Sequence, residues 1–250
     1  MTTRTAPSPS SPIPTRSKEA FVHRLFDTIT PAYDLFNRIS SLGLDRGWRS
    51  RAIRSLQLLP GTKVLDLASG TGDLAMAAAQ ELAPLGEVIA CDLSHPMLRF
   101  AQEKIFKVPA ALWHIRQVQG RAESLPLQDR SFHAAAIGFA LRNVSDLKGT
   151  FRELHRVLRP GGRLAILEFG RPNSLLLRIG HQVWLAFAIP LLGLLTTGRL
   201  WPFLYLRRSI LRFMPPAQVM ELLKASGFSH VKAEPLTGGA LYLYTARRLS

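Results

Sequence analysis

The chain has 250 residues but only one cysteine, Cys91. A single thiol cannot form an intramolecular disulfide, and it excludes a metal site built from several thiolates. The seven histidines are scattered without the paired spacing of metal ligands, so we predict no metal site. The missing disulfide framework favours a reducing compartment, and we expect a cytoplasmic protein.

Acidic residues are also scarce, because 17 Asp and Glu stand against 32 Lys and Arg and leave a formal net charge of +15. A surface of this charge attracts polyanions, either nucleic acid or the anionic face of a bilayer. The aromatic residues gather with apolar ones instead of alternating with basic ones on a strand, so we expect no nucleic-acid partner. The sequence predicts peripheral association with the inner face of the cell membrane.

The N-terminal part of the chain precedes the main domain. Residues 1–17 consist largely of Thr, Ser and Pro with no acid, which predicts a disordered tail. Between residues 18 and 39, apolar residues recur at helical spacing on both sides of Pro31, which predicts two short helices with a break there. A further helix is expected at 45–59. We expect these helices to cover the active site of a domain that spans residues 60–250.

From residue 60 onward, apolar runs alternate with segments of helical pattern, which predicts a doubly wound, mostly parallel sheet. The last two runs, 231–236 and 241–245, are joined across Thr237-Gly238-Gly239, a hairpin signal. The predicted fold class is therefore α/β, a Rossmann-like sheet of seven strands that ends in an antiparallel hairpin. The other expected strands are 63–67, 87–91, 115–119, 133–139 and 163–169, and the helices are 74–83, 95–106, 146–158 and 216–226.

The turn after the first strand carries the strongest functional pattern. Gly70 and Gly72 let the backbone turn sharply and approach a ligand closely. Ligands of open α/β sheets bind at this strand edge, where Asp66 can face a cationic group and Asp92 can accept hydrogen bonds from ribose hydroxyls. Asp92 has a second interpretation as a cap of the following helix. The glycines also satisfy a loose dinucleotide fingerprint, so a nicotinamide-binding oxidoreductase stays open, although no Tyr-x-x-x-Lys is present.

The segment 65–74, Leu-Asp-Leu-Ala-Ser-Gly-Thr-Gly-Asp-Leu, resembles the first motif of class I S-adenosylmethionine-dependent methyltransferases. Four further pieces, at 26–37, 40–48, 138–146 and 205–210, are similar to the bacterial demethylmenaquinone and polyprenyl-benzoquinol C-methyltransferases. The resemblance implies S-adenosylmethionine as the cofactor and methylation of a ring carbon of a prenylated quinol. Whether the ring is a naphthoquinol or a benzoquinol stays open, as does another small lipophilic acceptor.

The resemblance also implies a cofactor site at the same strand edge. Backbone N–H groups of the Ser69–Gly72 turn, at a helix N-terminus, are expected to hold the carboxylate of the cofactor. The chain departs from the family in having Arg121 where Asn is usual and Gly138 where a small hydroxyl residue is usual. Glu123 is either a substitute contact for adenine or a solvated acid. The implied cofactor residues are Asp66, Gly70, Thr71, Gly72, Asp92, Leu93, Arg121, Ala122 and Gly138.

The expected chemistry is in-line attack of a ring carbon on the sulfonium methyl group, which requires aligned reactants in a dry site. Arg142 is the first candidate for stabilising the quinolate charge, directly or through a water, with Asn143 and Tyr33 as partners of the ring oxygens. The alternative for Arg142 is a structural salt bridge with Asp146 or another acid. His181 is either a base or a packed histidine. The residues expected to contact the substrate are Tyr33, Asn37, Trp48, His181 and Tyr205.

Residues 179–198 contain no charge and reach the ~20 residues that a membrane span requires. Pro190 and the position of this stretch between strands of one sheet argue against a span. We expect instead a lid, about residues 172–213, which is helical on each side of Pro190 and whose apolar face accepts an isoprenoid tail. Its arginines and aromatic residues suit a membrane surface. A buried core insertion is the alternative, and the sequence leaves open whether the chain forms a homodimer.

Overall fold

The computed structural model describes residues 15–108 and 114–249, and among these residues seven strands form one sheet in the order β3-β2-β1-β4-β5-β7-β6. Strands β1 to β5 are parallel, and β7 runs antiparallel to both of its neighbours, β5 and β6. The predicted fold class is confirmed. The strands are β1 (Lys63–Leu67), β2 (Glu87–Asp92), β3 (Ile115–Gln119), β4 (Phe132–Gly138), β5 (Leu158–Phe169), β6 (Phe228–Leu236) and β7 (Leu241–Arg248).

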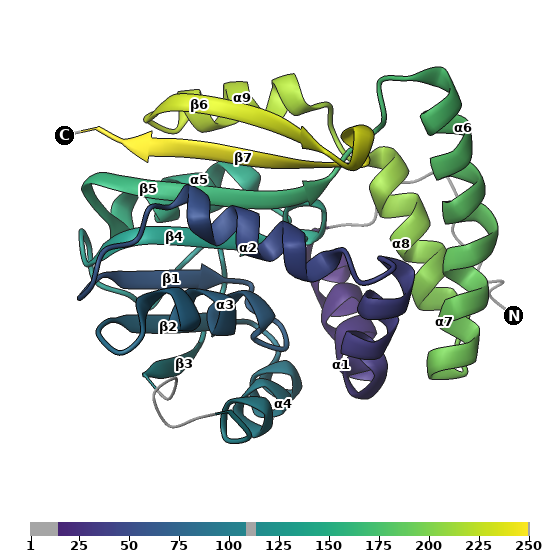
Figure 1. Cartoon of the computed structure of the whole chain (residues 1–250), viewed down its shortest axis with the longest axis horizontal. Coiled ribbons are helices and arrows are strands. Elements are labelled where there is room, and N and C mark those ends of the chain that lie inside the picture. Colours follow the sequence, from purple (N-terminus) through teal and green to yellow (C-terminus); the bar gives the residue numbers. More distant parts are fainter. Residues whose placement is uncertain (1–14, 109–113, 250) are drawn as a thin grey trace, which may run out of the picture.

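Helices cover both faces of the sheet, with α2 and α3 on one face and α5 and α9 on the other (Figure 1). Side chains alternate along β1, so Val64 packs in the core beneath α2 and α3, whereas Leu65 and Leu67 pack in the core beneath α5 and α9. Burial on both faces explains the continuous apolar runs of the sequence. The helices are α2 (Asp45–Ser55), α3 (Asp73–Leu82), α4 (His95–Ile105), α5 (Leu147–Val157) and α9 (Pro216–Ala225).

Helix α1 (Thr15–Ser40) is one continuous helix of 26 residues, so the predicted break at Pro31 is wrong. Pro31 lies on the exposed side of the helix, where its missing N–H removes a bond that faces water. Both halves of the helix bury apolar side chains in the same cluster, which keeps the helix in line; they include Leu25, Ile29 and Phe36. The helix starts inside the predicted tail, and residues 1–14 of that tail lie outside the described residues.

Other boundaries also differ from the prediction, since β6 begins at Phe228 rather than Val231 and β7 ends at Arg248 rather than Thr245. Helix α2 ends at Ser55 rather than Leu59, because Gln57 adopts a positive φ of 49° that a helix cannot contain. Strand β5 begins at Leu158 rather than Arg163, because the Arg-Pro-Gly-Gly segment predicted as a turn is accommodated as an irregularity in the pairing of β5 with β4.

The predicted lid contains one long helical segment, Leu175–Thr197, which we call the lid helix. It joins α6 (Leu175–Val183), a π-helical turn η3 (Trp184–Ala188) and α7 (Ile189–Thr197). The helix passes through Pro190 without a break, because the wider turn before the proline makes room for its ring. Helix α8 (Trp201–Arg212) follows the lid helix.

The lid helix, α8 and α1 stand together beyond the carboxyl ends of β1 and β4 (Figure 1). They share a separate core cluster, in which Phe36 of α1 meets Phe203 of α8 at 4.3 Å between ring centroids. Within the described residues, the lid helix alone is long and apolar enough to cross a membrane, judged by length and composition. These three elements form the roof over the edge of the sheet where ligands of this fold class bind.

Candidate functional site

Two cavities meet beneath α1 at the carboxyl edge of the sheet. The smaller, of about 140 Å³, lies over the ends of β1 and β2, and the larger, of about 390 Å³, lies beneath the lid helix and is mainly apolar. Four residues, Phe26, Tyr33, Phe139 and Asn143, line both cavities. The two cavities therefore share a wall formed by these side chains.

The smaller cavity collects most of the residues predicted to bind the cofactor. Asp66, Thr71 and Gly72 lie behind its wall rather than on it, whereas Glu123 lines it. The carboxylate of Glu123 accepts a hydrogen bond from the backbone N–H of Ser145 at 3.3 Å, so it is more than a solvated acid. Six of the nine predicted residues line this cavity: Gly70, Asp92, Leu93, Arg121, Ala122 and Gly138.

The turn after β1 has the sharp geometry that the glycines predict, with φ values of 54° at Gly70 and 80° at Gly72. Three of its N–H groups are already engaged within the protein. That of Ser69 donates to the Cys91 carbonyl at 3.1 Å, that of Gly70 to Asp92 Oδ2 at 2.8 Å, and that of Gly72 to the Ser69 carbonyl at 2.9 Å. The turn therefore offers fewer donors to a cofactor carboxylate than the sequence led us to expect.

Backbone strain also marks this edge. Ala68 at the tip of β1 and Phe139 at the tip of β4 have positive φ values of 57° and 58°, although neither is glycine. Both residues line the smaller cavity. Left-handed conformations of this kind carry an energetic cost and cluster at ligand sites. The strained residues therefore lie where β1 and β4 end at the smaller cavity.

Asp92 ends β2 with its carboxylate facing the smaller cavity. Oδ2 accepts from Gly70 N and Oδ1 from Ser94 N, both at 2.8 Å. The interpretation of Asp92 as the helix cap is wrong, because Ser94 Oγ caps α4 by accepting from Met97 N at 3.3 Å. Burial raises the pKa of Asp92, and the N–H groups of Ser94 and Gly70 oppose that rise.

Asp66 lies beneath the same turn with 1% of its surface exposed. Among the described residues, neither of its carboxyl oxygens nor the hydroxyl of Ser69 has a hydrogen-bond partner of ordinary geometry. Burial raises the pKa of Asp66 to about 8. Buried acceptors without partners are rare in folded proteins because they are costly, which indicates that a donor from outside the chain completes this position.

The larger cavity gathers the residues predicted to act on the substrate. The hydroxyl of Tyr205 donates to Asn143 Oδ1 at 3.3 Å, and Trp48 Nε1 donates to Thr237 Oγ1 at 3.0 Å, in the 3₁₀ turn η4 (Thr237–Gly239). His181 lies on the lid helix, where partial burial lowers its pKa. All seven predicted residues line this cavity: Tyr33, Asn37, Trp48, Arg142, Asn143, His181 and Tyr205.

Arg142 lies on the 3₁₀ turn η2 (Leu141–Asn143) after β4. Its Nη1 is 2.7 Å from Oε1 of Glu168 on β5, so the salt-bridge alternative is realised, with Glu168 in place of Asp146. Asp146 instead caps α5. Arg142 also faces the cavity, where its positive charge lowers the pKa values of Tyr33 and Tyr205 against the burial that raises both.

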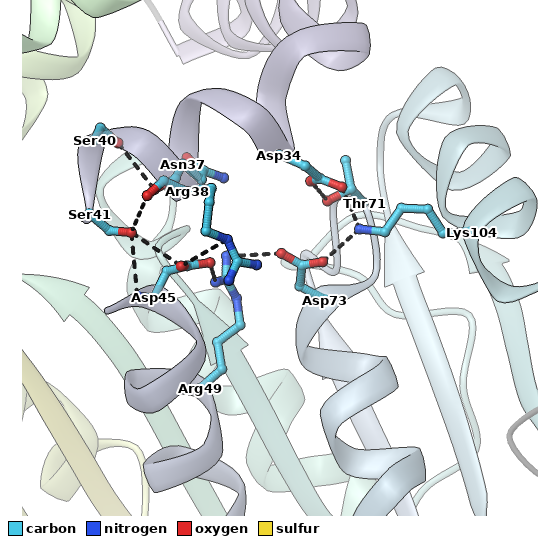
Figure 2. A network of polar contacts seen from close by, with 10 residues as sticks. All are labelled: Asp34, Asn37, Arg38, Ser40, Ser41, Asp45, Arg49, Thr71, Asp73 and Lys104. Atoms are coloured by element: carbon cyan, nitrogen blue, oxygen red, sulfur yellow. Dashed lines mark hydrogen bonds and ion pairs between the residues drawn. The ribbon is translucent and has the colours of Figure 1, made fainter. Parts of the chain in front are cut away.

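A network of charged side chains that the sequence analysis missed holds α1 on the first turn (Figure 2). Asp34 of α1 accepts from Thr71 Oγ1 at 2.6 Å and from Lys104 Nζ of α4 at 2.5 Å. Lys104 also donates to Asp73 at 2.6 Å, and Arg49 of α2 lies 3.4 Å from the same carboxylate. Thr71, predicted to bind the cofactor, therefore uses its hydroxyl to hold α1.

A second contact fastens α1 at its other half. Asp27 Oδ1 accepts from the hydroxyl of Ser94 at 2.7 Å, and Asp27 Oδ2 lies 2.8 Å from Nδ1 of His23. Asp27 and Asp34 belong to the Phe-Asp…Tyr-Asp piece at 26–37 on which the resemblance rests, so a signal for both contacts was present in the sequence. Their role, to seat α1 over the smaller cavity, emerges only in three dimensions.

The sequence matches the model of the ubiE/COQ5 methyltransferase family over residues 14–248. It is 40% identical over 225 residues to the ubiquinone/menaquinone biosynthesis C-methyltransferase UbiE of Syntrophotalea carbinolica, which covers 90% of this chain and 92% of the relative. It is 38% identical to the demethylmenaquinone methyltransferase of Lactiplantibacillus plantarum, over 88% of this chain and 92% of the relative.

Solved structures of methyltransferases share the fold. A possible histamine N-methyltransferase of Thermotoga maritima superposes with a TM-score of 0.63 at 19% identity, over 90% of this chain and 98% of that chain. Phosphoethanolamine N-methyltransferase 2 of Haemonchus contortus, with S-adenosylhomocysteine bound, gives 0.66 at 17% identity, over 96% of this chain and 61% of that chain. The protein is a methyltransferase that uses S-adenosylmethionine, rather than a nicotinamide oxidoreductase, and it belongs to the ubiE/COQ5 methyltransferase family.

Proposed function

We propose that this methyltransferase transfers a methyl group to a ring carbon of a prenylated quinol of the demethylmenaquinol type, in respiratory quinone biosynthesis. One observation carries the proposal: an apolar cavity of about 390 Å³ shares the wall of Phe26, Tyr33, Phe139 and Asn143 with the predicted cofactor cavity. An aromatic ring with a hydrophobic tail matches the larger cavity. The names of the two relatives support a quinol over other lipophilic acceptors.

The residues around the smaller cavity fit S-adenosylmethionine, which supplies an electrophilic methyl group when bound. The unpartnered oxygens of Asp66 and Ser69 would accept hydrogen bonds from its amino group. The carboxylate of Asp92 would accept from the ribose hydroxyls, since it faces the cavity. Arg121 and Ala122 line the same cavity and would hold the adenine.

The residues of the larger cavity would prepare the acceptor. A quinol carbon becomes a stronger nucleophile as its ring hydroxyl loses a proton, and a cation near that oxygen favours the loss. Arg142 supplies the positive charge, and Asn143 and Tyr33 would donate or accept hydrogen bonds at the ring oxygens. Burial lowers the pKa of His181, which favours its neutral form and makes it the alternative base. The apolar walls exclude water from the reacting atoms.

The function is tested with the purified protein, S-adenosylmethionine and chemically reduced demethylmenaquinol, with a benzoquinol acceptor in parallel. We expect a product heavier by one methyl group, detected by mass spectrometry. In cells that lack the protein, a quinone lighter by one methyl group should accumulate. If neither quinol is methylated and the cellular quinone pool is unchanged, the proposed substrate class is wrong.

Asp66→Asn is expected to stabilise the fold most at high pH while it weakens cofactor binding. An aspartate of the unfolded chain has a pKa near ~3.9, whereas burial raises the pKa of Asp66 in the fold to about 8. The fold therefore prefers the protonated form, and this stabilising contribution is lost as the pH rises from below the unfolded pKa through the folded pKa. Asparagine has no charge to bury.

Calorimetric scans should show a melting-temperature difference between the Asp66→Asn variant and wild type that grows from pH 5 to pH 9 (about the range that the two pKa values span). Asp129→Asn, at an exposed position, is the matched control and should show no comparable growth. A difference that stays constant with pH would contradict the burial of a titrating carboxyl at this position.

We further infer that the lid helix lies on the anionic inner surface of the cell membrane. Its inner side chains line the larger cavity, whereas its outer side exposes Phe187 (72%), Leu191 (57%) and Leu195 (73%) at helical spacing. Between Glu168 and Glu221 the chain carries arginines and no acid. Packing of the same helix against α1 and α8 favours an orientation along the surface over a span. A prenylated acceptor could then pass from the lipid into the cavity.

The triple variant Phe187→Ser, Leu191→Ser and Leu195→Ser should lower partitioning onto vesicles that contain phosphatidylglycerol by about 100-fold or more, since each exposed side chain contributes about 1 to 3 kcal/mol on burial in lipid. Co-sedimentation measures the bound fraction. The pair Leu59→Ser and Leu85→Ser, at exposed positions before β1 and β2, is the control and should bind as wild type. Unchanged binding of the triple variant, or a change in its sedimentation coefficient without lipid, would point to another occupant such as a second copy.

A further inference from the structure

Glu168 is a buried carboxylate that contacts mainly Arg142. It has no exposed surface and lies next to the end of β5. Oε2 accepts from the backbone N–H of Arg142 at 3.1 Å, and Oε1 accepts from Arg142 Nη1 at 2.7 Å and from Phe169 N at 2.8 Å. The carboxylate thus fixes both the backbone and the side chain of Arg142.

Further contacts hold the guanidinium of Arg142 in place. Its Nη1 also donates to the Phe139 carbonyl at 2.5 Å, and its guanidinium lies 5.0 Å from the ring centroid of Phe169. Its side chain is only 5% exposed, and its Nε has no hydrogen-bond partner among the described residues. Arg142 and Phe169 both line the larger cavity. The guanidinium is therefore held in one position at the cavity wall.

An arginine in an apolar cavity is stable only when its charge is compensated. Glu168 supplies that compensation from the side away from the cavity, so the pair is neutral overall while its positive end faces the ligand. A donor held in place before the reaction stabilises developing negative charge without reorganising. A guanidinium without its carboxylate partner would turn toward other acceptors and would no longer face the ligand.

We propose that Glu168 is a positioning residue of the reaction, which holds the guanidinium of Arg142 toward the ring oxygen of the acceptor as that oxygen becomes negative. The inference rests on the proposed methylation of a quinol. Glu168 touches neither ligand and acts only through Arg142. The experiment must therefore measure whether the effect of Glu168 on kcat depends on Arg142. It must separate this effect from any contribution of the salt bridge to stability.

The test is a double-mutant cycle with demethylmenaquinol as the acceptor. Glu168→Gln should lower kcat by about 100-fold, the scale of losing one aimed donor, with the Kd of S-adenosylmethionine unchanged. In the background of Arg142→Met, the same Glu168→Gln change should lower kcat no further, because the residue through which it acts is gone. Glu168→Asp, which keeps the charge, should recover part of the lost kcat.

The difference between the effect on kcat and the effect on the Kd of S-adenosylmethionine is a readout that a purely structural role would not give, because general damage to the fold would change both. If this single variant folds poorly, the double variant, which buries no charge, carries the test against Arg142→Met alone.

Two results overturn the inference: wild-type kcat in Glu168→Gln, or a further loss of kcat when Glu168→Gln is added to Arg142→Met. A wild-type protein that leaves demethylmenaquinol unmethylated would instead refute the proposed function. An active wild type with an unchanged Glu168→Gln variant would refute only the role of Glu168.

Discussion

Asp92→Ala is expected to weaken the binding of S-adenosylmethionine by about 100-fold or more. A hydrogen bond to a charged group contributes about 1.5 to 3 kcal/mol, and the carboxylate offers acceptors to both ribose hydroxyls. The substitution also frees the N–H groups of Gly70 and Ser94, which hold the ends of β1 and β2 in register at 2.8 Å from the carboxylate. Isothermal titration with the cofactor and with S-adenosylhomocysteine measures the loss.

The control for Asp92→Ala is the same change at Asp146, which caps α5 through the N–H of Gly149 and lines neither cavity. Asp146→Ala should cost about 1 kcal/mol of stability with unchanged cofactor affinity. Asp92→Ala should lower the cofactor affinity as well as the stability, because it also frees the N–H groups of Gly70 and Ser94. If Asp92→Ala binds S-adenosylmethionine with the wild-type affinity and heat, this carboxylate does not contact the cofactor.

The fold was predictable because its signals are local. Each parallel strand is buried on both faces, so it appears in the sequence as a short apolar run. In each helix between strands, apolar residues recur at helical spacing. The terminal hairpin was visible in the glycines after Thr237. The error at Pro31 fell where tertiary packing overrides a local rule, because burial of both halves of α1 keeps that helix continuous.

The partners of the site residues were much less predictable than the residues themselves. Arg142 was a candidate from its motif, but its carboxylate partner Glu168 comes from the neighbouring strand, 26 residues away. Asp34 meets Lys104 across 70 residues, and no periodicity links them. Strand order in the sheet decides the first contact, and the placement of α1 over the strand tips decides the second. Neither is encoded in any short window of sequence.

Gly193→Ala is expected to disable the lid. Gly193 lies on α7 where a Cβ would coincide with the ring of Phe203 on α8. Phe203 is buried and packs against Phe36 of α1, so the ring cannot move without disturbing the whole cluster between the lid and α1. Overpacking of this kind costs about 1 to 3 kcal/mol and sometimes more.

Because Phe36, Ile189 and Phe203 all line the larger cavity and none lines the smaller one, the damage caused by Gly193→Ala should be selective. We expect kcat/KM for a prenylated quinol to fall by about 10-fold or more, the kinetic equivalent of at least 1.4 kcal/mol, while cofactor affinity stays at the wild-type value. Gly47→Ala, in α2 with open space around the added methyl group, is the matched control and should be neutral or slightly stabilising.

If Gly193→Ala melts as wild type and keeps full activity, the lid is not packed on Phe203 in solution, and the cavity beneath it cannot be the substrate site in this form. A selective loss would instead indicate that the lid helix, α8 and α1 bind the acceptor, whereas the edge of the sheet binds the cofactor.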